Sequence, residues 1–152
     1  MTTSSLSRYI DDVACQCLGL RAARAARVVA RQYDQALRPL GISIGQYSVL
    51  MAVGAGAGRS ISKLADALGL ERTTLTRNLR VMEREHLVVL SDEGPRRTRS
   101  VSLTAKGEAM IVKAYPVWRA VQDKLMDAMG KEKGENARAL LDLVGNLDVA
   151  ES

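Results

Sequence analysis

The sequence predicts a mainly α-helical protein with one small β-hairpin, and three observations support this fold class. Apolar residues recur at helical spacing through most of the 152 residues. Between residues 86 and 104 the pattern changes to two short β-branched segments joined by a charged loop. Two helical segments with a tight turn between them precede this hairpin, and that order is typical of a winged helix-turn-helix.

The N-terminal third predicts two helices. The segment from Ser7 to about Leu37 is rich in alanine and has no glycine after Gly19, so we expect one long helix there. The following "RPLG" ends it. A second helix covers residues 44–53, and the glycine run "GAGAG" terminates it.

The predicted helix-turn-helix lies within residues 60–85. Ser60 is placed to cap the N-terminus of "SISKLADALG", and Gly69 supplies the C-terminal stop. After about three residues comes the helix of "ERTTLTRNLRVMERE", residues 71–85. Its apolar stripe, which we expect to pack against the preceding helix, consists of Leu75, Leu79 and Met82.

The predicted hairpin has its strands in "HLVVL" and "RSVSLT", and the connection between them is too long for a two-residue turn. Helical spacing returns at Thr104, where Pro116 is expected to kink the helix and Gly130 to close it. A last amphipathic helix is predicted to run through Ala137 and Leu147.

Composition indicates an ordinary globular protein with an anionic partner. Apolar residues make up 47% of the chain and charged residues 26%, with a net charge of +5. Nine Lys or Arg and six Asp or Glu lie between Arg59 and Ser100, so this segment alone carries +3. Nucleic acid is the commonest anionic partner of a soluble basic chain.

The chain is expected to be cytoplasmic, without membrane contact. Two cysteines so close together favour a reducing compartment, and "MTTSSLSRYIDD" lacks the apolar core of a signal peptide. The uncharged run from Pro39 to Gly58 has about the length of a membrane span. Its five glycines, its proline and its polar residues instead predict a buried core helix.

One face of the 71–85 helix has the chemistry of a DNA-reading surface. Thr73, Thr76, Arg77 and Arg80 share this face, with no acid among them. Threonine can hydrogen-bond a base edge and touch a thymine methyl, while arginine can bind guanine or phosphate through two bonds. The second helix of a helix-turn-helix lies in the major groove, so we predict DNA contact. A merely solvated basic face is the alternative.

Further predicted DNA contacts flank this face. Thr74 could contact DNA or pack inside, and Ser62 and Lys63 are placed to touch phosphates from the preceding helix. The hairpin loop would direct its basic residues towards phosphates or an adjacent minor groove, adding affinity more than sequence reading. These loop residues are Arg96, Arg97 and Arg99.

Three stretches resemble the MarR family of bacterial regulators. "LADALGLERTTLTRNLRVMEREHLV" followed by "RRTRSVSLTAKGEAM" is similar to the family's DNA-binding lobe, and "ARVVARQYDQALRPLGISIGQYSVL" to its first two helices. The resemblance implies a homodimer whose first and last helices interleave, with each recognition helix in one major groove of a pseudo-palindromic double-stranded DNA site. It implies a helical dimerisation region, residues 1–43 and 104–152, and a winged helix-turn-helix DNA-binding lobe, residues 44–103.

The chain departs from the family pattern around the wing. The family usually has Asp-x-Arg at the wing tip, and alignment on "VSLT" places the arginine at Arg97 but Pro95 at the aspartate position. His86 stands where the family usually has glycine. We therefore expect His86 to adopt a positive φ.

Cys15 and Cys17 are candidate sensor residues. Side chains two positions apart on a helix point about 200° apart, which disfavours an intrahelical disulfide. Inert thiols, a thiol switch, and a soft metal or metalloid bound by "CQC" are the open interpretations. The family includes peroxide sensors with a reactive cysteine in the first helix, but that position aligns nearer Gly19. In those sensors two tyrosines support the reactive thiol. Tyr33 aligns with one of them, whereas Ile44 occupies the position of the second.

No catalytic constellation is present, because there is one histidine, no phosphate loop and no evident nucleophile and base pair. We predict a dimeric, sequence-specific DNA-binding transcriptional regulator, most simply a repressor, that needs no cofactor or metal. A small molecule or a thiol-reactive signal would release it from its operator. Trp118 would either pack in the core or dimer interface or line a ligand pocket. The alternative is a protein-interaction or membrane-surface module using the first helix's arginine stripe, formed by Arg21, Arg24, Arg27, Arg31 and Arg38.

Overall fold

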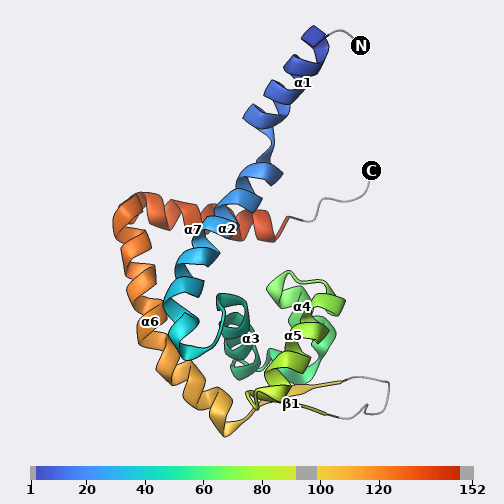
Figure 1. The fold of residues 1–152 in the computed structure, drawn as a ribbon, viewed down its shortest axis with the longest axis vertical. Coiled ribbons are helices and arrows are strands. Elements are labelled where there is room, and N and C mark those ends of the chain that lie inside the picture. Colours follow the sequence, from blue (N-terminus) through green and yellow to red (C-terminus); the bar gives the residue numbers. More distant parts are fainter. Residues whose placement is uncertain (1–2, 92–98, 148–152) are drawn as a thin grey trace.

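The structure is a computed structural model that describes residues 3–91 and 99–147 (Figure 1). It is mainly helical with a two-stranded antiparallel sheet, which confirms the predicted fold class. The elements in chain order are α1 (Thr3–Gln16), α2 (Leu18–Leu37), η1 (Arg38–Leu40), α3 (Ile44–Gly54), η2 (Ala57–Arg59), α4 (Ile61–Leu68), α5 (Arg72–Arg84), β1 (Val88–Leu90), β2 (Val101–Leu103), α6 (Ala105–Met129) and α7 (Lys131–Gly145).

The prediction of one long N-terminal helix is wrong, because the chain breaks at Cys17. The backbone of Cys17 is extended, with φ of −66° and ψ of 109°, and its Sγ accepts a hydrogen bond from the backbone N–H of Leu20 at 3.5 Å. Cys17 thereby caps α2, a local side-chain contact that alanine content does not reveal. Beyond this break α1 points away from the rest of the molecule (Figure 1).

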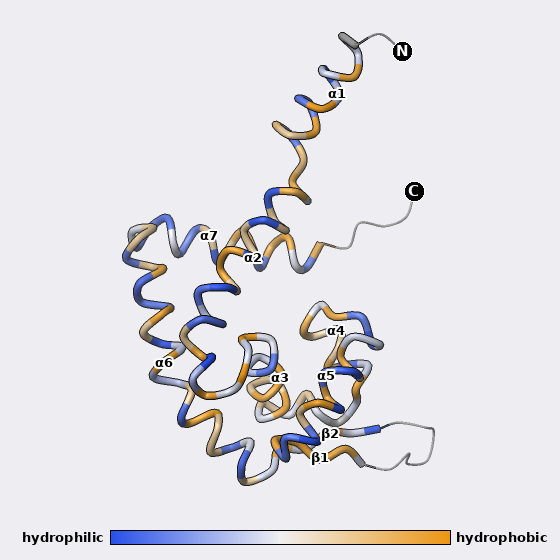
Figure 2. Tube along the Cα trace, in the orientation of Figure 1, coloured by the Kyte–Doolittle hydropathy of each residue, from blue (hydrophilic) through white to orange (hydrophobic). Residues whose placement is uncertain are grey.

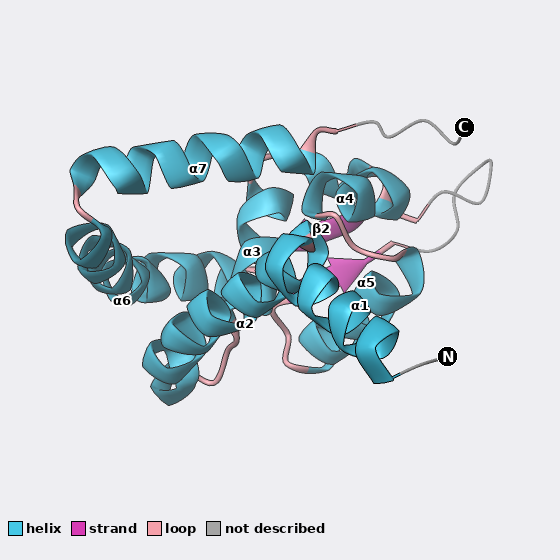
Figure 3. Cartoon of the chain, turned by 90° about the horizontal axis from the view of Figure 1, so that it is seen from above, coloured by secondary structure: helices cyan, strands magenta, loops and turns pink. Residues whose placement is uncertain are grey.

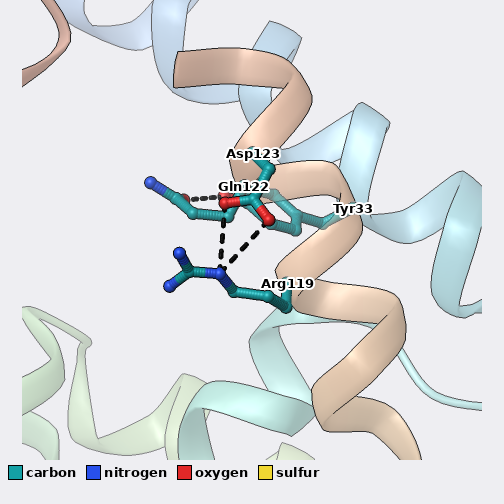
Figure 4. Close-up of polar contacts among 4 residues, drawn as sticks. All are labelled: Tyr33, Arg119, Gln122 and Asp123. Atoms are coloured by element: carbon teal, nitrogen blue, oxygen red, sulfur yellow. Dashed lines mark hydrogen bonds and ion pairs between the residues drawn. The ribbon is translucent and has the colours of Figure 1, made fainter. Parts of the chain in front are cut away.

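Two polar contacts tie the end of α2 to α3 and α6. The carboxylate of Asp34 accepts a hydrogen bond from the backbone N–H of Ile44, with an Oδ1 to N distance of 2.7 Å. The hydroxyl of Tyr33 donates to Oε1 of Gln122 on α6 (Figure 4). Burial raises the pKa of Tyr33, so this hydroxyl remains a neutral donor.

The helix-turn-helix has the predicted caps. Ser60 Oγ accepts a hydrogen bond from the backbone N–H of Lys63 at 3.4 Å, and Gly69 ends α4 with a φ of 62°. Residues 69–71 form the short connection to α5. The predicted apolar stripe of α5 is fully buried, and α5 packs against α4 and β1; its members are Leu75, Leu79 and Met82.

The hairpin and the C-terminal helices follow the predicted order. Val88 on β1 lies opposite Leu103 on β2. His86, just before β1, has a φ of 57°, which confirms the expected positive value. Pro116 lies inside α6, which continues as a helix on both sides of it, and Gly130 ends that helix as predicted. Seen from above, α6 and α7 meet at a corner (Figure 3).

The core lies where the end of α2, the hairpin and helices α3 to α6 meet. In Figure 1, α3 lies between the long helices α2 and α6 on one side and the α4–α5 pair on the other. The uncharged α3 contributes four buried residues to this core, in agreement with the predicted core helix: Tyr47, Val49, Leu50 and Val53. Among the helices described, none combines the length and the apolar content that crossing a membrane would require. The largest fully buried side chains include Leu37, Leu50, Leu64, Leu75, Leu79 and Met82.

Candidate nucleic-acid interface

A surface groove of about 780 Å³ follows the outer face of α5. It brings together Thr73, Thr76, Arg77 and Arg80, which are four of the residues predicted to contact DNA. Because Leu75 and the other residues of the apolar stripe face the core, the residues on the opposite side of the helical wheel face outward. The groove is therefore a consequence of the amphipathic pattern of α5.

Two arginines that sequence reasoning missed also line the groove. Arg72 and Arg84 lie at its two ends along α5. Their positions, four residues before Thr76 and four after Arg80, place them on the same helical face. That spacing was present in the sequence and would have identified both residues.

The groove keeps its positive charge available to a partner. Within residues 3–91 and 99–147, none of the four arginines at 72, 77, 80 and 84 forms an ion pair. The acid that also lines the groove, Glu83, accepts a hydrogen bond from the backbone N–H of Leu90 at 3.2 Å. The face can therefore attract a polyanion such as the phosphate backbone of a nucleic acid.

The threonines of the groove differ in what they can offer. The hydroxyl of Thr76 donates to the backbone carbonyl of Arg72 at 2.8 Å. Its oxygen lone pair and its methyl group remain for a partner. Thr73 is exposed and makes no such bond with a described residue, so its hydroxyl can both donate and accept.

A second group of predicted residues lies at the start of α4. Ser62 and Lys63 are exposed in its first turn, and the backbone N–H of Ile61 donates to the carbonyl of Arg99 at 3.2 Å. The backbone just before β2 thus lies beside the start of α4. Thr74 is exposed but does not line the α5 groove. The remaining predicted wing residues, Arg96 and Arg97, lie outside the described residues.

The two cysteines lie at the joint between α1 and α2, and both are free thiols. Cys15 is exposed on α1, while Cys17 is half-buried at the break. Because Cys17 is outside a helix, the angular separation expected for a continuous helix does not apply to this pair. In the described part of the chain, no three His, Cys, Asp or Glu residues are gathered as a metal site.

The arginine stripe of α2 is exposed along its whole length. Arg21 donates from Nη1 to the carbonyl of Ala14 at 3.3 Å, which spans the break between α1 and α2.

The comparisons with known proteins point to the same family. A model of the MarR family matches residues 40–98, while a comparison with curated proteins gave no match. The structure of the Mycobacterium tuberculosis transcriptional regulator MosR in complex with DNA is 38% identical, with a TM-score of 0.78; the match covers 86% of this chain and 94% of MosR.

Two further structures share the fold at lower identity. CouR from Rhodococcus jostii RHA1, bound to p-coumaroyl-CoA, is 20% identical with a TM-score of 0.76, and the match covers 91% of this chain and 98% of CouR. The oxidised form of MarR from E. coli is 21% identical with a TM-score of 0.68, over 85% of this chain and 94% of MarR.

Proposed function

Because this chain belongs to the MarR family of transcriptional regulators, we propose that it binds a pseudo-palindromic double-stranded DNA site as a homodimer and represses transcription. The observation that carries the proposal is the α5 groove, where hydroxyls share one helical face with guanidinium groups that form no ion pair with any described residue. The presence of DNA in the MosR structure, at 38% identity, supports it. Members of this family are regulators, so we propose no catalytic activity.

Exposed apolar side chains on the terminal helices support the homodimer. Each of them is at least 40% exposed in the single chain, and hydrophobic positions recur along both α1 and α7 (Figure 2). Apolar surface of this extent marks an interaction site, which interleaved terminal helices of two subunits would bury. These side chains are Leu6, Tyr9, Ile10 and Val13 on α1 and Leu140, Leu141, Leu143 and Val144 on α7.

In the proposed complex, α5 enters the major groove and the start of α4 lies over the DNA backbone. Arg77 and Arg80 have the planar forks that bind guanine or phosphate in pairs of hydrogen bonds. Lys63 and Ser62 would contact phosphates, adding affinity that falls with salt concentration. A two-fold symmetric dimer repeats these contacts on the second half-site.

Arg77→Ala tests this assignment. On a site first selected from random-sequence DNA, we expect the variant to lose discrimination at one base pair of each half-site by about 1–3 kcal/mol, as for a bidentate guanine contact. Fluorescence anisotropy titrations with single-base variants of the site measure the effect.

The matched control for Arg77→Ala is Arg24→Ala, which removes an exposed arginine from the stripe of α2. It should leave base discrimination unchanged. If Arg24→Ala weakens the complex and Arg77→Ala does not, the arginine stripe is the active surface and the proposed interface is wrong.

We propose that a small molecule or a thiol-reactive signal releases the protein from DNA. Either signal must favour a dimer arrangement that does not fit DNA, and a few kcal/mol of differential binding suffices. Related folds have been seen with p-coumaroyl-CoA, in CouR, and in an oxidised form, in MarR. In this chain the thiol of Cys17 caps α2 at its joint with α1, so chemistry at that sulfur would alter the joint.

Replacement of both cysteines by serine tests the thiol signal. Hydrogen peroxide or arsenite should weaken DNA binding by the native protein at least about tenfold, or about 1.4 kcal/mol. The Cys15→Ser, Cys17→Ser double variant should bind DNA normally and ignore both reagents, since a serine hydroxyl can still cap α2. A native protein whose anisotropy titration is unaltered by every thiol reagent would exclude the thiol signal.

A further inference from the structure

An acid lies in the α5 groove, where its charge opposes the binding of a polyanion. Glu83 lines the groove together with Arg72, Thr76 and Arg80, since these four positions share one helical face. Within the described residues, its carboxylate forms no ion pair with the arginines of the groove. Glu83 therefore neither neutralises an arginine nor attracts DNA, so another interaction must account for its place on this face.

The carboxylate of Glu83 contacts the hairpin. Its Oε1 accepts a hydrogen bond from the backbone N–H of Leu90, the last residue of β1, with an Oε1 to N distance of 3.2 Å. The chain reverses at His86, whose φ is 57°, and β1 then lies against α5 (Figure 1). A side chain near the end of α5 thus bonds the strand that follows it.

The N–H of Leu90 lies at the outer edge of the sheet. Leu90 is opposite Val101 in the antiparallel pair, while the next N–H along the strand, that of Ser91, donates to the carbonyl of Ser100 at 3.0 Å. Residues that exchange hydrogen bonds alternate along an antiparallel strand, so the N–H of Leu90 points away from β2. An edge N–H needs a partner from outside the sheet, and Glu83 supplies a charged acceptor.

The other strand of the hairpin is held against α4. The backbone N–H of Ile61 donates to the carbonyl of Arg99, two residues before β2, at 3.2 Å. The hairpin is consequently bonded at two places, by Ile61 at the start of α4 and by Glu83 near the end of α5. These two contacts join α4, α5 and the hairpin into one surface.

Glu83 is poorly placed to read a base. A carboxylate can accept a hydrogen bond from the N4 amino group of cytosine. In a helix-turn-helix, however, the N-terminal residues of the second helix meet the base edges, and Glu83 is the last residue but one of α5. At 1.5 Å per residue it lies about 15 Å along the helix axis from Thr73. Its Oε1 is also already bonded to Leu90.

We propose that Glu83 is a positioning residue for DNA binding, whose carboxylate holds the outer edge of β1 on α5 and so fixes the hairpin relative to the recognition helix. Helix and hairpin can then meet a major groove and the neighbouring backbone together, with less freedom to lose on binding. This gain exceeds the repulsion between one carboxylate and the phosphates. The hydrogen bond itself is independent of DNA, whereas its effect on affinity rests on the proposed function.

Hydrogen exchange of the Leu90 amide, followed by ¹⁵N NMR on the full-length protein without DNA, tests the contact. Glu83→Ala should accelerate this exchange at least about tenfold, because the amide loses its charged acceptor. Glu83→Gln should keep the amide protected, since the side-chain carbonyl of glutamine can accept the same bond. The amide of Leu79, in the buried middle of α5, should exchange alike in all three proteins.

Anisotropy titrations on the selected DNA site test the role in binding. Glu83→Gln should bind about twofold more tightly than the native protein, the effect of removing one like charge about 10 Å from a phosphate. Glu83→Ala loses the same charge and also the contact. We expect it to bind about fivefold more weakly, with a flatter salt dependence, because phosphate contacts of the hairpin are lost. Opposite signs in the two variants are what a positioning role requires.

The matched control is Glu85→Ala. It removes an exposed carboxylate that does not line the groove and makes no hydrogen bond or ion pair with a described residue. This variant should bind DNA no more weakly than the native protein. A fivefold loss in Glu85→Ala would show that the effect at Glu83 does not depend on its bond to Leu90, and the proposal would fail.

Three other results would also overturn the role of Glu83. Tighter DNA binding by Glu83→Ala would show that the carboxylate is only a repulsive charge. A loss confined to one base pair in both Glu83 variants would show that it reads a base. An unchanged exchange rate at Leu90 in Glu83→Ala would reject the contact itself, whereas a native protein that selects no DNA site would reject the proposed function instead.

Discussion

Gly107→Ala is expected to lower the free energy of unfolding by about 3 kcal/mol, the upper range for overpacking a tight contact. A Cβ at this position would lie 2.1 Å from the carbonyl oxygen of Leu87. That carbonyl is backbone and already accepts a hydrogen bond from the N–H of Thr104 at 3.2 Å, so it cannot move without disturbing the junction of hairpin and α6. Urea denaturation at fixed protein concentration measures the loss.

The control for Gly107→Ala is Gly45→Ala, because Gly45 also lies in the first turn of its helix. A Cβ at Gly45 would have its nearest neighbour, Ser43 Oγ, at 3.8 Å. We expect no loss there, or a gain of about 0.5 kcal/mol from the reduced freedom of the unfolded chain. Equal losses in the two variants would show that the α6–hairpin contact is not the cause.

Leu79→Ala is expected to cost about 3 kcal/mol of unfolding free energy, through lost burial and the cavity left behind. Leu79 is 0% exposed at the centre of the stripe that holds α5 against α4 and β1. Because the same helix carries the groove arginines, DNA affinity should fall at temperatures well below the melting transition of the native protein. Thermal unfolding followed by circular dichroism gives the stability change.

Val112→Ala is the control for Leu79→Ala, since Val112 is 74% exposed on α6. Its stability should stay within about 0.5 kcal/mol of the native protein. A Leu79→Ala protein as stable as Val112→Ala would mean that the stripe of α5 is not part of the core.

Much of the DNA-binding lobe could be predicted because its signals are local. The cap at Ser60 and the stop at Gly69 each depend on a few neighbouring residues, and both are confirmed. The positive φ of His86, which is also confirmed, was implied by the resemblance to a family that usually has glycine there. Likewise, the outward face of α5 follows from the apolar stripe opposite it. DNA contact by that face stays a prediction that the Arg77 titrations test.

The break at Cys17 could not be predicted from composition. Alanine-rich sequence favours a helix on both sides of it, and neither proline nor glycine occupies the position. The interruption depends on a thiol that caps the next helix, and the same residue is half of the candidate sensor pair. The helix propensity of a segment is a sum over its residues, and it does not include a single side-chain cap such as that of Cys17.

The sequence by itself determined which faces of the helices are apolar and which are charged, and hence the fold class and the exposed basic face of α5. Only the tertiary structure decided that the Tyr47 hydroxyl has no hydrogen-bond partner among the described residues and that Gly107 lies against a backbone carbonyl. The physical reason is the separation along the chain over which each kind of interaction acts. Periodicity and capping act over a few residues, whereas an unpaired hydroxyl or a close approach depends on distances between segments far apart in the chain.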